Sequence, residues 1–120
     1  MIALPHSADG IHLLVDFFGV APANLRRVPE MEELFLRGAR AAGARVLMHH
    51  FHEFDAAGGV TGVVLLAESH ISIHTWPERE FAAIDIFMCG NLRPRAALEI
   101  IQNGWMPQKV VAREVRRGHV

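Results

Sequence analysis

The stretch "SHISIHTWPEREFAAIDIFMC", Ser69 to Cys89, contains two runs of alternating residues on either side of the break "PERE". In the first run, two histidines, a serine and a tryptophan occupy every second position: His70, Ser72, His74 and Trp76. The positions between them hold Ile71, Ile73 and Thr75. A period of two is typical of a β-strand whose two faces differ. The short break predicts an antiparallel hairpin with one largely polar face.

The spacing of this hairpin decides which residues of its two strands are neighbours. If Trp76 faces Phe81, the numbers of paired residues add to 157, and Ser69 then faces Met88, next to Cys89. A loop closure that differs by one residue would pair Ser69 with Cys89 directly. In both cases we expect the only thiol of the chain to lie beside the peptide bond that precedes Ser69.

Outside the hairpin, the sequence predicts two helices and four strands. The first helix is expected over 28–43, from apolar residues at helical spacing. The second is expected over 93–104, with Pro94 near its start and Gly104 at its end. The strands are expected over short apolar or alternating runs: 10–19, 44–54, 60–67 and 108–115. This order favours a single α+β domain spanning 1–120, a two-layer sandwich with a mostly antiparallel sheet and two helices on one face.

Composition narrows the classes of function. The 120 residues are 51% hydrophobic and 21% charged, which is typical of one globular domain. The formal net charge of −1 gives no basic surface for nucleic acid or an anionic membrane, so neither is expected as a partner. No apolar run reaches the ~18 residues of a membrane helix, and the first residues lack a signal-peptide layout. With one cysteine, which excludes an internal disulfide, we expect a reducing, cytoplasmic location.

His74 lies on the same predicted strand as Ser69, five residues further along. At ~3.3 Å per residue the two are roughly 16 Å apart, and the odd spacing turns their side chains to opposite faces. The two side chains of one chain therefore should not meet. If they cooperate, they do so between subunits across a two-fold axis, which predicts a homodimer with two shared sites.

The segment "AESHISIHTWPE" followed by "FAAIDIFMCG" resembles the signature of the prokaryotic S-adenosylmethionine decarboxylases, the small pyruvoyl-dependent type. Its core is Glu-Ser-His, a histidine five residues after the serine, Trp-Pro-Glu, and a cysteine twenty residues after the serine. The pieces "GIHLLVDFFG", "FHEF" and "GVTGVV" follow the family's order. The resemblance therefore covers most of residues 10–116.

The resemblance implies that the chain cleaves itself between Glu68 and Ser69. The Ser69 hydroxyl would attack the Glu68 carbonyl, and elimination from the resulting ester would leave a β chain (1–68) and an α chain (69–120) that begins with a pyruvoyl group. This covalent cofactor supplies a ketone, which no side chain offers, to condense with the substrate amino group and accept electrons when CO₂ departs. His74 would remove the serine α-proton during processing, and Cys89 would protonate the product carbanion.

Three further roles follow only from the resemblance. Thr61 stands where the family usually has a serine that assists processing. Phe54 would stack on the adenine and face the sulfonium, and Glu78 would accept hydrogen bonds from the ribose. All three would come from the subunit that faces Ser69 and Cys89.

The leading hypothesis is therefore a carboxy-lyase that converts S-adenosylmethionine into the aminopropyl donor for spermidine. Asp55, beside Phe54, would favour a cationic amino acid if it points inward, so L-ornithine or L-arginine is the alternative substrate. An uncleaved, non-enzymatic ligand-binding dimer is the alternative of another class. A metal site is not expected, because His50 and His52 share a face without an Asp or Cys cluster beside them.

Overall fold

The structure is a computed structural model that describes residues 8–54 and 58–118. Its strands are β1 (Gly10–Phe18), β2 (Val46–Glu53), β3 (Val60–Leu66), β4 (Ser69–Trp76), β5 (Phe81–Cys89) and β6 (Lys109–Arg117). Its helices are α1 (Val28–Ala41) and α2 (Pro94–Trp105), with short 3₁₀ helices η1 (Pro22–Leu25) and η2 (Pro77–Arg79). The order of helices and strands confirms the order predicted from the sequence.

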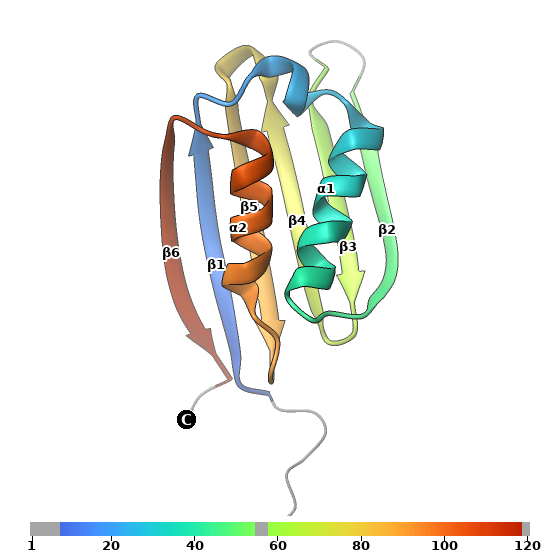
Figure 1. Cartoon of the computed structure of the whole chain (residues 1–120), viewed down its shortest axis with the longest axis vertical. Coiled ribbons are helices and arrows are strands. Elements are labelled where there is room, and N and C mark those ends of the chain that lie inside the picture. Colours follow the sequence, from blue (N-terminus) through green and yellow to red (C-terminus); the bar gives the residue numbers. More distant parts are fainter. Residues whose placement is uncertain (1–7, 55–57, 119–120) are drawn as a thin grey trace, which may run out of the picture.

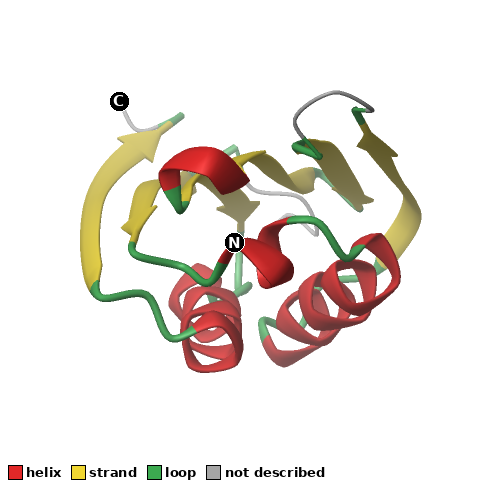
Figure 2. Cartoon of the chain, turned by 90° about the horizontal axis from the view of Figure 1, so that it is seen from above, coloured by secondary structure: helices red, strands yellow, loops and turns green. Residues whose placement is uncertain are grey.

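The six strands form one sheet in the order β2-β3-β4-β5-β1-β6, and every neighbouring pair is antiparallel. Both helices lie on the same face of this sheet (Figure 1; Figure 2). The predicted α+β sandwich is confirmed. Among the described residues, no helix has the length and apolar character needed to cross a membrane.

The hairpin has the predicted register. Trp76 pairs with Phe81 and His70 with Phe87, so the numbers of paired residues add to 157 along β4 and β5. Along β4, every second residue from Ser69 to Thr75 is buried against the helix layer, while the residues between are partly or fully exposed. The polar face anticipated from the sequence is therefore the face that the helices leave open.

The core lies between the sheet and the helices. Its largest fully buried strand side chains come from three central strands: Leu13, Val15, Phe17, Ile71, Ile73, Ile84, Ile86 and Met88. Phe35 of α1 packs against Trp105 of α2 and Phe51 of β2, with ring centroids 5.4 and 5.9 Å apart. Each such side chain contributes about 1.5–3 kcal/mol by leaving water. The helix layer is thus fixed on one face, and a site must use the other face or the ends of the strands.

One sequence prediction was wrong in detail. Gly104 does not end the second helix, which continues to Trp105 and stops where Met106 adopts a left-handed conformation (φ 47°). A Cβ on Gly104 would lie 2.6 Å from Leu34 Cδ1 of α1. Gly104 thus lies where the Leu34 side chain of the other helix approaches it closely, and the left-handed residue at the helix end is Met106.

Candidate active site at the two ends of strand β4

The first end of β4 brings Ser69 and Cys89 together, as the hairpin spacing predicts. The backbone N–H of Cys89 donates a hydrogen bond to Ser69 Oγ over 3.2 Å. Ser69 is only 8% exposed, whereas Cys89 is half-buried. The hydroxyl of Ser69 is therefore held at the start of a central strand by a backbone donor that belongs to the same residue as the thiol.

The residue before Ser69 has an unusual backbone. Glu68 adopts a left-handed conformation with φ 60° in the turn between β3 and β4. For a residue with a Cβ, this region of φ and ψ costs about 1–3 kcal/mol and persists only where the surroundings enforce it. Here the ladder pair Leu66–Ser69 closes the turn and enforces the conformation. The peptide bond expected to be cut therefore follows a strained residue.

The thiol of Cys89 is held in its protonated form. Burial raises its pKa, and the negative charge of Glu68 raises it further. A thiol with a raised pKa is a poor nucleophile at neutral pH but retains its proton for donation. This is the protonation state that a proton donor requires.

The other end of β4 carries Thr61 and His74. These residues are register partners on β3 and β4, and Thr61 Oγ1 shares a 3.0 Å hydrogen bond with His74 Nδ1. The hydroxyl thus fixes the orientation of the imidazole ring, and the other ring nitrogen, Nε2, is left for a reacting group.

A cavity of about 220 Å³ adjoins this pair. Phe54 and Glu78, the two substrate residues implied by the resemblance, both line it together with Thr61, His74 and Trp76. Phe54 and Trp76 are 51% and 40% exposed, so both rings offer a face to a ligand. The cavity joins an aromatic surface, a carboxylate and an imidazole, a set suited to a ligand with a flat ring and hydroxyl groups.

A buried threonine holds this cavity in shape. Thr75 Oγ1 donates to the carbonyl of Leu25 and accepts from the N–H of Val60, each over 2.8 Å. Three segments of the chain are thereby tied together behind the cavity, because these hydrogen bonds connect η1, β3 and β4. Asp55, whose direction bears on the substrate, lies outside the described residues.

One chain does not bring the two ends together. Ser69 and His74 point to opposite faces of β4, and five residues of strand separate them by roughly 16 Å. Cys89 lies at the level of Ser69, while Thr61 lies at the level of His74. Each chain therefore presents two separate groups of candidate residues, one at each end of the same strand.

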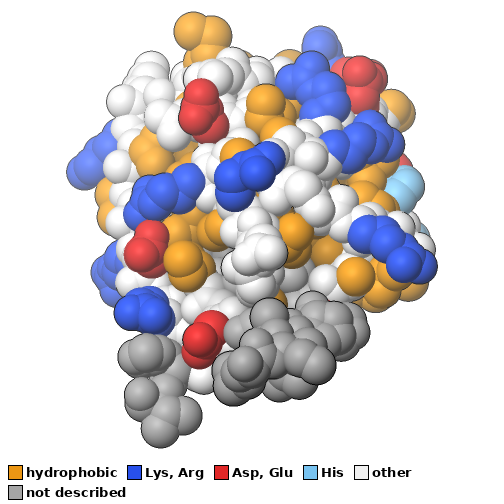
Figure 3. Space-filling model, turned by 60° about the horizontal axis from the view of Figure 1, so that its bottom comes forward, with side chains coloured by type: hydrophobic (Ala, Val, Ile, Leu, Met, Phe, Trp, Pro, Cys, Tyr) orange, Lys and Arg blue, Asp and Glu red, His pale blue; other side chains and the backbone are white. Residues whose placement is uncertain are grey.

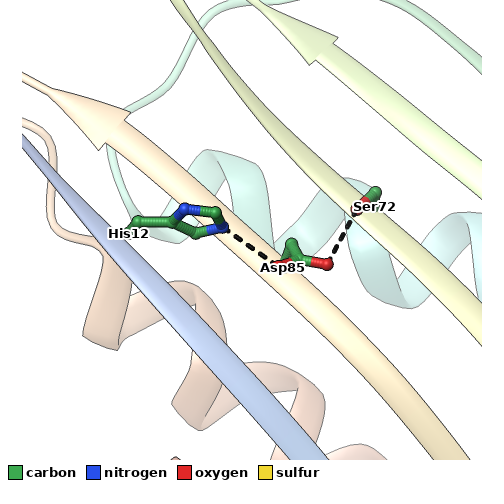
Figure 4. Close-up of polar contacts among 3 residues, drawn as sticks. All are labelled: His12, Ser72 and Asp85. Carbon is green, nitrogen blue, oxygen red and sulfur yellow. Dashed lines mark hydrogen bonds and ion pairs between the residues drawn. The ribbon is translucent and has the colours of Figure 1, made fainter. Parts of the chain in front are cut away.

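A polar network in the middle of the open face was missed by the sequence analysis. His12 Nε2 donates to one oxygen of Asp85 over 3.0 Å, and Ser72 Oγ donates to the other over 3.5 Å (Figure 4). His70 packs beside this network, and its pKa is lowered by burial, then by His12, against an opposing effect of Asp85. The polar alternation of the strands gave a signal, but the pairing of β1 with β5 joins residues 73 apart in the sequence.

The described residues contain no group of three His, Cys, Asp or Glu side chains arranged to hold a metal ion. His49 contacts Glu32 of α1, with His49 Nδ1 2.9 Å from a carboxylate oxygen, and so lies on the helix side of β2. His52 instead packs edge-on against Phe54, with ring centroids 4.7 Å apart. His49 and His52 of β2 thus have an ion-pair partner and a packing partner, respectively.

The comparisons with known proteins identify one family. The family model for S-adenosylmethionine decarboxylase matches residues 11–118. The S-adenosylmethionine decarboxylase proenzyme of Persephonella marina is 41% identical over 112 residues, covering 92% of this chain and 84% of the relative. The proenzyme of Methanococcus vannielii is 39% identical, covering 92% and 91% of the two chains.

Among solved structures, the adenosylmethionine decarboxylase from Aquifex aeolicus VF5 superposes with a TM-score of 0.85 at 34% identity. The superposition covers 95% of this chain and 94% of that one. The same fold thus extends over nearly the whole length of both proteins. The chain therefore belongs to the S-adenosylmethionine decarboxylase family, as a decarboxylase proenzyme of the small prokaryotic type.

Proposed function

We propose that the chain cuts its own backbone between Glu68 and Ser69 and then decarboxylates S-adenosylmethionine at a site shared by two subunits. The observation that carries the proposal is the position of the Ser69 hydroxyl, next to the strained Glu68 and bonded to the N–H of Cys89 at 3.2 Å. This geometry supports an intramolecular reaction because the hydroxyl belongs to the residue that follows the carbonyl and is restrained by a hydrogen bond.

In the first step, Ser69 Oγ adds to the Glu68 carbonyl carbon and the C–N bond breaks, so an ester replaces the amide. The Ser69 α-proton is then removed, the bond from Cβ to Oγ breaks, and Glu68 leaves as a carboxylate. Water replaces the nitrogen of residue 69, which departs as ammonia, and the second fragment begins with a pyruvoyl group. Strain at Glu68 favours the cut, because cleavage frees this residue from the closed turn.

His74 of a second subunit is the base that we assign to the elimination step. With a proton on Nδ1 donated to Thr61, the Nε2 lone pair is free to accept the Ser69 α-proton. Thr61 has the hydroxyl that this hydrogen bond requires. Its role is therefore to orient the ring.

A second copy fits the open face of the sheet. Seven large apolar side chains of the strands remain 37–51% exposed on this face: Leu14, Phe18, Met48, Leu65, Trp76, Val111 and Val115. Exposed apolar patches of this kind mark interaction surfaces. On the helix side and lower end, by contrast, charged side chains lie among the hydrophobic ones (Figure 3). We infer a homodimer in which two sheets pack face to face.

The residues present also fit the pyruvoyl group and the substrate. When formed, the group would supply an electron-accepting ketone, and Cys89, with its raised pKa, would give its proton to the product carbon. Phe54 would lie against the adenine and near the sulfonium, and Glu78 would bind the ribose hydroxyls, both from the cavity that also holds His74.

The intact mass of the purified protein tests the cleavage. We expect two fragments, residues 1–68 and 69–120, with the second lighter by one ammonia than simple hydrolysis would leave it. Ser69→Ala should give one unbroken chain without turnover. An unbroken wild-type chain in an active sample would contradict the proposal. An unbroken, inactive wild-type chain that still binds S-adenosylmethionine would indicate a binding protein instead.

Turnover measured on several substrates tests the choice of S-adenosylmethionine. Release of CO₂ from S-adenosylmethionine, L-ornithine and L-arginine is compared under identical conditions, with Ser69→Ala as the blank. We expect release from the first alone, because the cavity offers an aromatic surface beside a carboxylate. Release from only a basic amino acid would overturn the assignment of the substrate but not that of the pyruvoyl chemistry.

A further inference from the structure

We propose that the chain between β1 and α1, residues 19–27, sets how tightly the cavity beside His74 holds the nucleoside part of the substrate. It acts through Thr75, which we assign as a positioning residue for Phe54 and Glu78. The inference rests on the roles that the proposed function gives to these two residues. It adds a determinant of affinity in a segment that does not line the cavity.

The two binding residues lie on turns beyond the end of the β3–β4 ladder. Phe54 follows β2, and Glu78 lies in η2, between β4 and β5. The ladder ends at the pair Thr61–His74. Other contacts must therefore fix the separation of the two turns, and the shape of the cavity that both turns line depends on this separation.

The Thr75 hydroxyl makes such a contact where the ladder ends. Thr75 is 6% exposed, and its Oγ1 accepts a hydrogen bond from the N–H of Val60 over 2.8 Å. The residue before Val60 is Gly59, whose carbonyl accepts the N–H of Phe54 over 2.8 Å. A Cβ on Gly59 would lie 2.8 Å from the carbonyl oxygen of Thr75, so the two backbones are in close contact. The position of the Phe54 backbone thus depends on Thr75.

The β1–α1 connection, blue at the upper end of the sheet in Figure 1, holds the other turn at two points. The Leu25 carbonyl accepts the Thr75 hydroxyl over 2.8 Å, and the N–H of Val20 donates to the Glu80 carbonyl over 3.0 Å. Val20 and Leu25 are fully buried, so both points belong to the core. Glu80 is left-handed (φ 52°), a conformation that persists only where the surroundings enforce it. The turn that carries Glu78 is therefore held before and after this residue.

These contacts are separate from the group assigned to processing. Thr75 points to the helix layer, whereas His74 lies on the open face, where its ring shares a 3.0 Å hydrogen bond with Thr61. Loss of the Thr75 hydroxyl therefore leaves the base of the elimination step in place. It allows the two turns to move relative to each other, and a ligand that must fix them again binds more weakly.

The affinity for a nucleoside that cannot react tests the inference. 5′-Methylthioadenosine has the adenine and the ribose but lacks the amino-acid part. Its Kd for the cleaved protein is measured by calorimetry, beside KM and kcat for S-adenosylmethionine. Thr75→Val keeps the shape of the side chain and removes both hydrogen bonds, so Kd and KM should each rise roughly tenfold. The kcat and the extent of cleavage should change little. Thr75→Ser keeps the hydroxyl and should recover most of the affinity.

Two further variants separate positioning from stability. Ile101→Val removes a fully buried methyl group from α2, so it lowers stability while all the hydrogen bonds of Thr75 remain, and its Kd should be unchanged. Gly59→Ala places a methyl group against the Thr75 carbonyl and forces the same two segments apart. It should raise Kd, and it keeps the inference testable if Thr75→Val does not fold.

The pattern across these variants decides the outcome. A joint rise of Kd and KM in Thr75→Val and Gly59→Ala, absent from Thr75→Ser and Ile101→Val, supports the inference. An unchanged Kd in folded Thr75→Val, or in Gly59→Ala where Thr75→Val does not fold, overturns it, as does an equal rise in Ile101→Val. When the wild-type chain is cleaved and active, such a result refutes the positioning role alone. An unbroken, inactive wild-type chain refutes the proposed function and this inference with it.

Discussion

The two ends of β4 differ in what they offer. The Ser69 end is closed: the serine is 8% exposed, bonded to a backbone N–H, and preceded by a strained residue. The His74 end is open, with an exposed imidazole beside a cavity of about 220 Å³. In the proposed function, the first end would provide the atoms that react, and the second would provide the base and the binding surface. Because the two side chains point to opposite faces of the same strand, that function needs a second subunit.

The largest expected effect comes from separating the two ends into different chains. Ser69→Ala and His74→Ala should each stay uncleaved when made alone. Made together, they form a mixed dimer in which the Ser69 of one chain faces the His74 of the other. Mass spectrometry should then show cleavage of the His74→Ala chain only, together with recovered turnover. If the mixed dimer forms and neither chain is cut, the two ends act within one chain or not at all.

Removal of the thiol should separate the two reactions. Cys89→Ala leaves Ser69, Thr61 and His74 in place, so we expect both fragments to appear. Turnover should fall by about 10²–10⁴-fold, the usual contribution of a positioned proton donor. Cys89→Ser keeps a weaker proton donor, so its turnover should lie between that of the unchanged chain and that of Cys89→Ala. Loss of cleavage in a folded Cys89→Ala dimer would show that the thiol acts in processing.

At the imidazole end, loss of the Thr61 hydrogen bond should slow cleavage less than loss of the His74 ring that it orients. Thr61→Val keeps the shape but removes the bond to His74, which is worth about 0.5–1.5 kcal/mol. Cleavage should slow by roughly 2–10-fold in a time course. Thr61→Ser is the matched variant and should cleave at a rate close to that of the unchanged chain. Equal cleavage rates for Thr61→Val and Thr61→Ser would show that the Thr61 hydroxyl takes no part in the mechanism.

The smallest effect concerns the pH dependence of the closed end. In uncleaved Ser69→Ala, the thiolate absorbance of Cys89 should appear at a higher pH than in the unfolded chain, because burial and Glu68 raise its pKa. The folded chain then binds the thiol proton more tightly, so the free energy of unfolding falls as pH rises through this range. Glu68→Gln should move the titration to lower pH. An unchanged titration would mean that burial alone raises the pKa.

The sequence predicted the features that depend on local spacing. The alternation of β4 and the four-residue break fixed the pairing of Trp76 with Phe81, and with it the position of Ser69 beside Cys89. The same spacing predicted that Ser69 and His74 of one chain lie apart, on opposite faces of β4. These predictions succeeded because a hairpin's register is decided by its own residues.

Features that depend on distant strands were not predicted. β1 enters the sheet between β5 and β6, and nothing near His12 indicates that Asp85 is its partner. Likewise, Gly104 has the sequence pattern of a helix stop, yet its role depends on the approach of Leu34 from another helix. Local patterns give elements and hairpins, whereas contacts between elements require the fold.

The strand order has a consequence for the two pieces that self-cleavage would leave. Residues 1–68 contribute β1, β2 and β3, and residues 69–120 contribute β4, β5 and β6. In the sheet, β1 of the first piece lies between β5 and β6 of the second (Figure 1). The two pieces are therefore interleaved in the sheet. Neither can dissociate unless the hydrogen bonds on both sides of β1 break. A chain cut between Glu68 and Ser69 can in this way remain one stable folded unit.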